Sequence, residues 1–226
     1  MITLKTLLLT TATTALAGPL SPSEQPPLLS RKSITPGSGT HDGFFYHFWS
    51  NGCNSSSVAY ANGPGGSYSV TWKDCMGFVA GKGWTPGVED RNVTFAADFN
   101  PWGNDYLSVY GWTRDPQIEY YVVENWGTFN PTGMFGGKGV RIEVDGGWYT
   151  VGLYRRVPIA LGGTLVTQVF SVRDERDRRN NGTVTLKRHF EAWKQGLGVK
   201  LGTMDYQILA LEGYMSSGEG NVTVFK

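Results

Sequence analysis

The sequence predicts an all-β protein, an antiparallel sandwich with a single helix packed on it. The 226-residue chain contains 31 Gly, 8 Trp, 11 Tyr and 11 Phe but only 17% charged residues. This composition is typical of short strands joined by turns. No aromatic residue occurs before Phe44, and alternating apolar and polar residues recur beyond it. We expect a single domain, because all-β sandwiches of this length are usually one unit.

We expect the first 32 residues to target the chain for secretion rather than to form part of the folded domain. Residues 1–17 contain one basic residue, an uncharged stretch and a final Ala-Leu-Ala, the pattern that signal peptidase cleaves. The uncharged stretch is too short to span a bilayer, which takes about 20 residues. Residues 18–32 are rich in proline and end in Arg31-Lys32, so we expect a pro-segment. The domain would then be residues 33–226 of a secreted, extracellular protein.

Two cysteines lie symmetrically about a turn sequence. Cys53 and Cys75 are each eleven residues from Pro64, which lies within the glycine-rich segment Asn62–Gly66. Residues on both sides alternate as strands do, so a hairpin folded at Pro64 would place the two cysteines opposite each other. We expect a disulfide, which an oxidising compartment permits. Two separate buried thiols are the alternative.

Further strands follow along the chain, separated by glycine-rich turns. In residues 106–112, Tyr106, Tyr110 and Trp112 share one face, and Leu107 and Val109 share the other. The other strand-like runs are residues 117–123, 140–144, 149–153, 206–212 and 221–225.

One segment has helical rather than strand periodicity. Within Leu186–Leu197, Phe190 and Trp193 recur at helical spacing, and Gly196 and Gly198 end the run. We therefore expect one α-helix packed against the strands.

Charge and motif content exclude several classes of function. The net charge is +1, whereas nucleic-acid-binding proteins usually carry a basic patch. The three histidines are too scattered to indicate a metal site. The sequence has no P-loop, no G-x-G-x-x-G and no G-x-S-x-G. We expect a monomer without metal or cofactor that binds neither nucleic acid nor membrane.

Two glutamates have unusual neighbours. Glu119 shares a strand face with Tyr121 and Val123, and Glu212 shares one with Ile208 and other apolar residues. Most strand carboxylates lie on a solvated face, but on an apolar face a carboxylate either finds a partner or has its pKa raised by desolvation. A pair of carboxyl groups, one with a raised pKa, is what glycoside hydrolysis requires.

The segments around these glutamates resemble a known family. Glu119–Pro131 resembles the first active-site signature of glycoside hydrolase family 11, the endo-1,4-β-xylanases, and Glu212–Gly218 resembles the second. Further matches occur in the family's order at residues 62–66, 81–84, 110–114, 170–173 and 189–193. The resemblance covers about residues 40–226. It implies a β-jelly-roll sandwich of two curved antiparallel sheets around a deep cleft, and an enzyme that hydrolyses xylan or a related plant cell-wall polysaccharide.

The resemblance also implies roles for individual residues. Glu119 would be the nucleophile and Glu212 the general acid/base of a retaining reaction. Substrate contacts would come from Trp49, Tyr110, Trp112, Tyr121, Arg156, Pro158, Gln168 and Tyr206. Arg155 is an alternative to Arg156, and core filling is an alternative role for Tyr110 and Trp112.

The chain departs from the family pattern at three places. Gly77 stands where the family usually has Asn or Asp, whose side chain bonds the acid/base. The loop Arg155–Gly163 is shorter than the family's thumb and lacks its serine. Val169 and Phe170 replace an aromatic-Trp pair. These departures leave an alternative open: a weakly active or inactive xylanase-fold protein that binds cell-wall polysaccharide or a host protein. Retention of Glu119 and Glu212 favours the enzyme.

Overall fold

A computed structural model describes residues 33–54, 57–157 and 165–226, all within one compact unit, Arg31–Lys226. The predicted signal peptide (residues 1–17), the predicted pro-segment (18–32) and Pro158 lie outside the described residues. The comparison of the loop Arg155–Gly163 with a family thumb also falls largely outside them.

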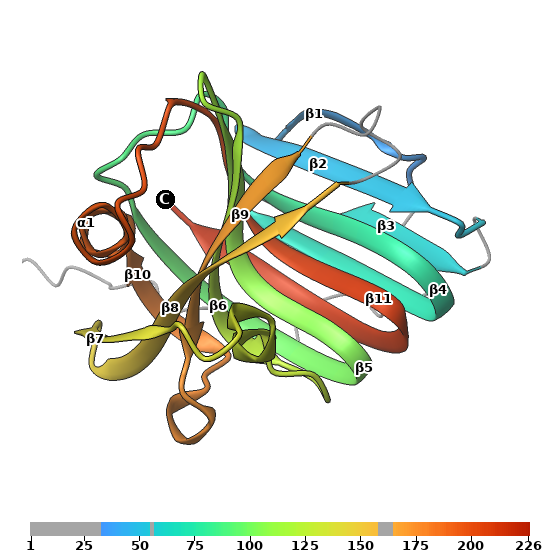
Figure 1. The fold of residues 1–226 in the computed structure, drawn as a ribbon. Coiled ribbons are helices and arrows are strands. Elements are labelled where there is room, and N and C mark those ends of the chain that lie inside the picture. The colour runs from blue at the N-terminus through green and yellow to red at the C-terminus, as the bar shows by residue number, and fades with distance from the viewer. Residues whose placement is uncertain (1–32, 55–56, 158–164) are drawn as a thin grey trace, which may run out of the picture. The chain divides into compact units, whose positions relative to one another are not determined.

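Eleven strands in the described residues form one continuous sheet (Figure 1). The strands are β1 (Gly37–His41), β2 (Phe44–Asn51), β3 (Val58–Asn62), β4 (Ser67–Trp84), β5 (Asn92–Arg114), β6 (Ile118–Trp126), β7 (Val140–Val144), β8 (Gly147–Arg156), β9 (Val166–Arg173), β10 (Asn181–Thr185) and β11 (Thr203–Phe225). Their spatial order is β1-β2-β4-β11-β5-β6-β9-β8-β7, while β3 pairs with β4 and β10 with β5. The described ranges also contain three helices: η3 (Pro131–Phe135), η5 (Glu175–Asp177) and α1 (Leu186–Leu197).

Three long strands give the sheet its two layers. β4 has 18 residues, and β5 and β11 have 23 each; Figure 1 shows all three turning back on themselves. In β11 the pairing register shifts near Ser216, next to Met215, whose φ is +49°. The Tyr68 hydroxyl donates to the Leu209 carbonyl at 3.0 Å and joins the two layers. The predicted layers are therefore halves of a single sheet, because bulges let a strand bend from one layer into the other.

The sheet is mixed rather than purely antiparallel. β6 and β9 pair in parallel, with Glu119 opposite Gln168, whereas the neighbouring strand pairs are antiparallel. The chain leaves β6, forms the β7–β8 hairpin and comes back along β9, which accounts for the parallel pair. This pairing brings Gln168 beside Glu119.

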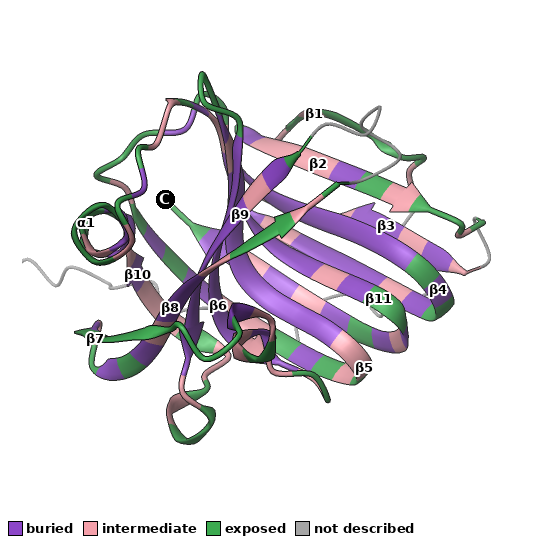
Figure 2. Cartoon of the chain, in the orientation of Figure 1, coloured by how far each residue is buried: buried purple, intermediate pink, exposed green. Residues whose placement is uncertain are grey.

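The predicted alternation of faces is present in β5. Leu107 and Val109 lie in the core between the layers, whereas Tyr106 and Tyr110 belong to a second cluster on the opposite face. We call that opposite face the glutamate face; it carries Glu119 and the buried residues Val79, Tyr106, Tyr110, Tyr121, Val123, Phe170, Ile208 and Ala210. Figure 2 shows long buried stretches along β4, β5 and β11.

The predicted helix and hairpin are both confirmed. α1 has the predicted limits, ends at Gly198 with φ +66°, and packs Phe190 on Tyr120 with ring centroids 5.3 Å apart. β3 and β4 form the hairpin around the predicted turn. Cys53 and Cys75 are joined by a disulfide with an S–S distance of 1.98 Å.

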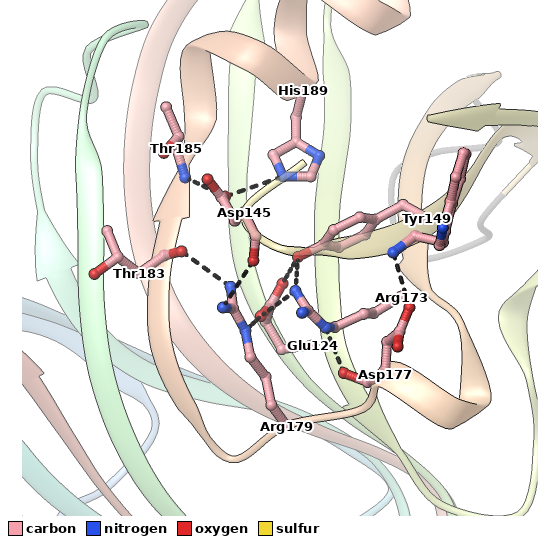
Figure 3. Close-up of polar contacts among 10 residues, drawn as sticks. Glu124, Asp145, Tyr149, Arg173, Asp177, Arg179, Thr183, Thr185 and His189 are labelled. Carbon is pink, nitrogen blue, oxygen red and sulfur yellow. Dashed lines mark hydrogen bonds and ion pairs between the residues drawn. The ribbon is translucent and has the colours of Figure 1, made fainter. Parts of the chain in front are cut away.

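A buried charge network lies on the other side of β6 from the glutamate face (Figure 3). Glu124 is fully buried, and its carboxylate accepts a hydrogen bond from the Tyr149 hydroxyl at 2.5 Å. The same carboxylate pairs with Arg179 and lies 3.7 Å from Arg173 Nη1. Arg173 Nη1 also donates to the Tyr149 hydroxyl at 2.7 Å. We call these four side chains the Glu124 network.

Candidate active site

Glu119 is buried and held by four donors. Its Oε1 accepts hydrogen bonds from the hydroxyls of Tyr110 at 2.8 Å and Tyr121 at 2.9 Å. Its Oε2 accepts from Gln168 Nε2 at 2.6 Å and Arg156 Nη2 at 2.9 Å. The fold thus brings together five residues that the sequence analysis singled out. With both oxygens bonded, the carboxylate has a fixed orientation.

Strand pairing explains why these side chains meet. Trp112 of β5 lies opposite Glu119, and Tyr110 lies opposite Tyr121. Trp112 Nε1 donates to the Tyr110 hydroxyl at 2.6 Å, so the Tyr110 proton is free to bond Glu119. Burial chiefly, and then the Glu119 charge, raise the pKa of Tyr110 and of Tyr121 well above the ordinary value. Both phenols therefore remain donors, and Tyr110 fills the protein interior while it contacts Glu119.

Glu212 has a different environment. It lies in β11, opposite Val79 of β4 and Tyr106 of β5. Its Oε2 is buried and has no hydrogen-bond partner among residues 33–54, 57–157 and 165–226. Burial, followed by the charge of Glu119, raises the pKa of Glu212 to about 8. Glu212 therefore carries a proton at neutral pH.

The two glutamates are distant in sequence, but both interact electrostatically with Tyr121 and Arg156. Both contribute to the raised pKa of Tyr121, for which burial is the main cause. Arg156, which bonds Glu119, also opposes the rise in the pKa of Glu212. Glu119 and Glu212 therefore belong to one site.

The other predicted contact residues lie around this pair. Trp49 of β2 lies opposite Val79, in the same row across the sheet as Glu212, and its side chain is 43% exposed. The Tyr206 ring lies 6.1 Å from that of Tyr110. Tyr206 also lines a hollow of about 570 Å³ whose other lining residues are Trp112, Thr113, Arg114, Asp115, Gln117 and Asp205.

Two contributors to the site were not predicted from the sequence. Phe170, noted only as a departure, stacks on Tyr121 with ring centroids 4.4 Å apart and an interplanar angle of 7°. Tyr106 lies opposite Glu212, whose charge adds to the burial that raises the pKa of Tyr106. Tyr106 could have been predicted, because it shares a strand face with Tyr110.

Gly77 leaves open space near Glu212. A Cβ at this position would meet only the Trp49 ring, at 3.9 Å. Gly77 pairs with Tyr214, one row along the same face from Glu212. An Asn side chain could therefore be accommodated there.

The site chemistry rests on carboxyl groups. The described part of the chain contains no group of three or more His, Cys, Asp or Glu able to hold a metal ion. One carboxylate fixed by four donors, beside a second carboxyl group that stays protonated, is the acid–base arrangement used to cleave glycosidic bonds. Fold and site together define a glycoside hydrolase.

Comparison with known proteins specifies the family. The family model described as glycosyl hydrolases family 11 matches residues 41–223, and the chain belongs to that family. It is 46% identical over 232 residues to "Endo-1,4-beta-xylanase 4" of Pyricularia oryzae, covering 97% of each chain. It is 47% identical over 215 residues to "Endo-1,4-beta-xylanase B" of Phanerodontia chrysosporium, covering 94% of this chain and 72% of the relative. It is 42% identical over 229 residues to the "Ethylene-inducing xylanase" of Hypocrea rufa, covering 99% of this chain and all of the relative.

Proposed function

We propose that this protein is a secreted endo-1,4-β-xylanase that hydrolyses internal bonds of xylan with retention of configuration. Family membership and relatives named as xylanases support the reaction class. The observation that carries the proposal is Glu212 beside Glu119: its pKa is raised to about 8, and its Oε2 has no hydrogen-bond partner among the residues that the structure describes. A carboxyl group in that condition is available to give its proton to a substrate.

In the first step, Glu212 donates its proton to the glycosidic oxygen while a Glu119 oxygen attacks the anomeric carbon. The C–O bond to the leaving sugar breaks, and a glycosyl ester of Glu119 forms. The four donors to Glu119 hold the carboxylate in place for this attack.

In the second step, Glu212 acts as the base. Esterification removes the negative charge of Glu119, which is one cause of the raised pKa of Glu212. The pKa of Glu212 then falls, so its carboxylate can take a proton from water. The water oxygen attacks the anomeric carbon, the ester bond to Glu119 breaks, and Glu212 is protonated again.

The surrounding side chains supply the substrate contacts. Trp49 offers an exposed indole ring in the same row as Glu212, suited to the C–H face of a sugar ring. Tyr206 and Trp112, at the 570 Å³ hollow, would contact sugars further along the chain. Pro158 is retained as a proposed contact on the family resemblance alone.

Secretion and a monomeric state are part of the proposal. The Cys53–Cys75 disulfide is suited to an oxidising compartment. Among the helices of the described ranges, none is long and apolar enough to cross a bilayer.

A second candidate function is that of a weakly active xylanase-fold protein that binds cell-wall polysaccharide or a host protein. Gly77 favours it, because the open space there leaves Glu212 without a side-chain partner from that position.

Reducing-sugar release from xylan tests the two candidates. Wild type should exceed both Glu119→Gln and Glu212→Gln by several orders of magnitude, and NMR should show the retained anomer as the first product. A wild type no more active than either variant would refute the enzyme and favour the binding protein.

A further inference from the structure

A second hollow lies away from the two glutamates. It has a volume of about 440 Å³ and is lined by Arg141, Trp148, Asp174, Glu175, Arg176 and Asp177. Trp148 lies near the start of β8, whereas Arg156, which bonds Glu119, is the last residue of that strand. The eight steps along the chain from Trp148 to Arg156 correspond to about 26 Å along the strand. The hollow is therefore a separate part of the surface, which we call the Trp148 hollow.

Trp148 is fixed in position while its ring remains exposed. Its backbone N–H donates to Asp177 Oδ2 at 2.9 Å, and its carbonyl accepts the Asp174 N–H at 2.8 Å. The Arg141 guanidinium carbon lies 4.9 Å from the ring centroid, and Arg141 is itself paired with Asp174. The side chain is nevertheless 44% exposed. The indole ring is therefore held in one position while much of it remains exposed to solvent.

The wall of the hollow is anchored to the protein interior. Arg173 of the Glu124 network donates from its Nε to the Asp177 carbonyl at 2.5 Å (Figure 3). Asp177 belongs to η5, the short helix that bears three of the lining residues. A binding surface supported in this way loses little conformational entropy when a ligand binds.

The chemistry of the lining favours an uncharged, hydroxyl-rich ligand. Three carboxylates and two guanidinium groups surround one indole ring. The excess of negative charge opposes polyanions such as nucleic acid. The charged groups can donate to and accept from hydroxyls, and the ring can pack against an apolar face. Sugar rings combine C–H faces with hydroxyl edges, and the volume lies within the usual range of ligand pockets, roughly 300–1,000 Å³.

We propose that the Trp148 hollow is a second binding site for β-1,4-linked polysaccharide, separate from the site of hydrolysis. The choice of ligand rests on the proposed function. A polymer bound at both places dissociates less readily than one bound at a single place, because the second contact becomes intramolecular. A short oligosaccharide cannot reach both sites and gains nothing from the hollow.

Affinity electrophoresis in gels containing soluble xylan measures this contribution. The host is the full chain with Glu119→Gln, which prevents hydrolysis during the run. Adding Trp148→Ala should weaken retardation about fivefold, because one of two contacts is lost. Arg141→Met, which removes the stacked cation, should also weaken it. Thermal unfolding of each variant shows whether the fold is retained.

Trp102→Ala is the matched control, because Trp102 is 74% exposed but does not line the hollow. It should change retardation less than twofold. Equal losses for Trp102→Ala and Trp148→Ala, or no loss for Trp148→Ala and Arg141→Met, would overturn the proposal.

Activity assays separate failure of this inference from failure of the proposed function. In the active chain, Trp148→Ala should lower kcat/KM on polymeric xylan and leave kcat/KM on a xylo-oligosaccharide of three or four units unchanged. Equal losses on polymer and oligosaccharide would contradict a separate site. A wild type without activity would refute the enzyme, whereas retardation that depends on Trp148 would still support the hollow.

Discussion

Glu119 and Glu124 are two buried glutamates on the same strand, β6, and they face opposite sides of the sheet. Glu124 lies among two arginines and Tyr149, so its charge is balanced within the protein (Figure 3). Within the described part of the chain Glu119 has a single cationic partner, Arg156, and it shares its surroundings with a second carboxyl group, Glu212. Burial and hydrogen bonding of a carboxylate are therefore not signs of catalysis by themselves. The distinguishing feature is a second carboxyl group kept protonated nearby.

The two regions also differ in how completely their polar groups are satisfied. The Glu124 network uses both carboxylate oxygens. Glu212 retains a buried oxygen without a partner in the described residues. Such a group lowers stability, and active sites commonly carry groups of this kind. We therefore expect mutations in the site of Glu119 and Glu212 to change mainly activity, and mutations in the Glu124 network to change mainly stability.

The largest expected effect comes from replacing each of the two β6 glutamates by glutamine in turn. Glu119→Gln should lower kcat on xylan by about four orders of magnitude, because the proposed nucleophile is lost. Glu124→Gln should leave activity per folded molecule nearly unchanged and lower the free energy of unfolding by about 3–5 kcal/mol, since it leaves buried arginine charge uncompensated. Denaturant unfolding and xylan assays measure both. A comparable loss of activity in folded Glu124→Gln would remove the contrast.

The next effect concerns the pH dependence caused by Glu212. Its folded-state pKa is about 8 against an ordinary value of 4.5. The folded state therefore binds the proton more tightly, so wild-type stability falls as pH rises from about 4.5 to 8, by at most about 5 kcal/mol. Glu212→Gln should remove this fall and stabilise the protein at pH 9. The basic limb of kcat/KM for wild type should lie near pH 8. A pH-independent difference in stability between the two proteins would contradict this assignment.

Asp105 is a further buried carboxyl group, and we expect it to cause a smaller pH dependence of stability than Glu212. Its Oδ1 accepts from Trp72 Nε1 at 3.0 Å and Ser216 Oγ at 2.5 Å, and burial raises its pKa to about 6 from 3.8. Stability should fall as pH rises from about 4 to 6, by at most about 3 kcal/mol. Asp105→Asn should flatten that part of the stability curve while xylan hydrolysis changes less than twofold. A large loss of activity in the folded variant would place Asp105 in the catalytic site.

The smallest effect is expected at Gly77. The open space there lets Gly77→Asn place an amide donor near Glu212, one row away on the same face. A hydrogen bond to the ionised carboxylate lowers its pKa, so the basic limb of kcat/KM should move down by about half a unit to one unit. Gly77→Ala, which adds no donor, is the control. An equal shift in both variants would show that a change in packing is responsible.

Local patterns were sufficient to predict several elements. The turn at Asn62–Gly66 predicted the hairpin of β3 and β4. The disulfide was also predicted, but β2 rather than the hairpin brings the cysteines together: Asn51 at the end of β2 lies opposite Gly77 of β4, so Cys53 comes beside Cys75. The periodicity of Phe190 and Trp193 and the following glycines predicted the limits of α1. Period-two alternation assigned Glu119 and Tyr121 to the same face.

Other features could not be read from local patterns. Glu124 lies on the same strand as Glu119, and its partners come from β8, β9 and the segment before β10. The proximity of Glu119 and Glu212 depends on the curvature of a sheet in which β11 and β6 are separated by β5. Trp148 is one of eight tryptophans in the sequence, and only its contacts with Arg141 and Asp177 distinguish it as a binding surface.

By itself the sequence determined the class of fold, the helix and the family, and it singled out Cys53, Cys75, Glu119 and Glu212, because these follow from periodicity and from long local motifs. Only the tertiary structure decided that Glu212 keeps its proton, that Glu124 is neutralised by arginines and that the two layers are one sheet. The physical reason is that a pKa depends on burial and on charges contributed by distant segments. The fold has to bring those segments together before such interactions exist.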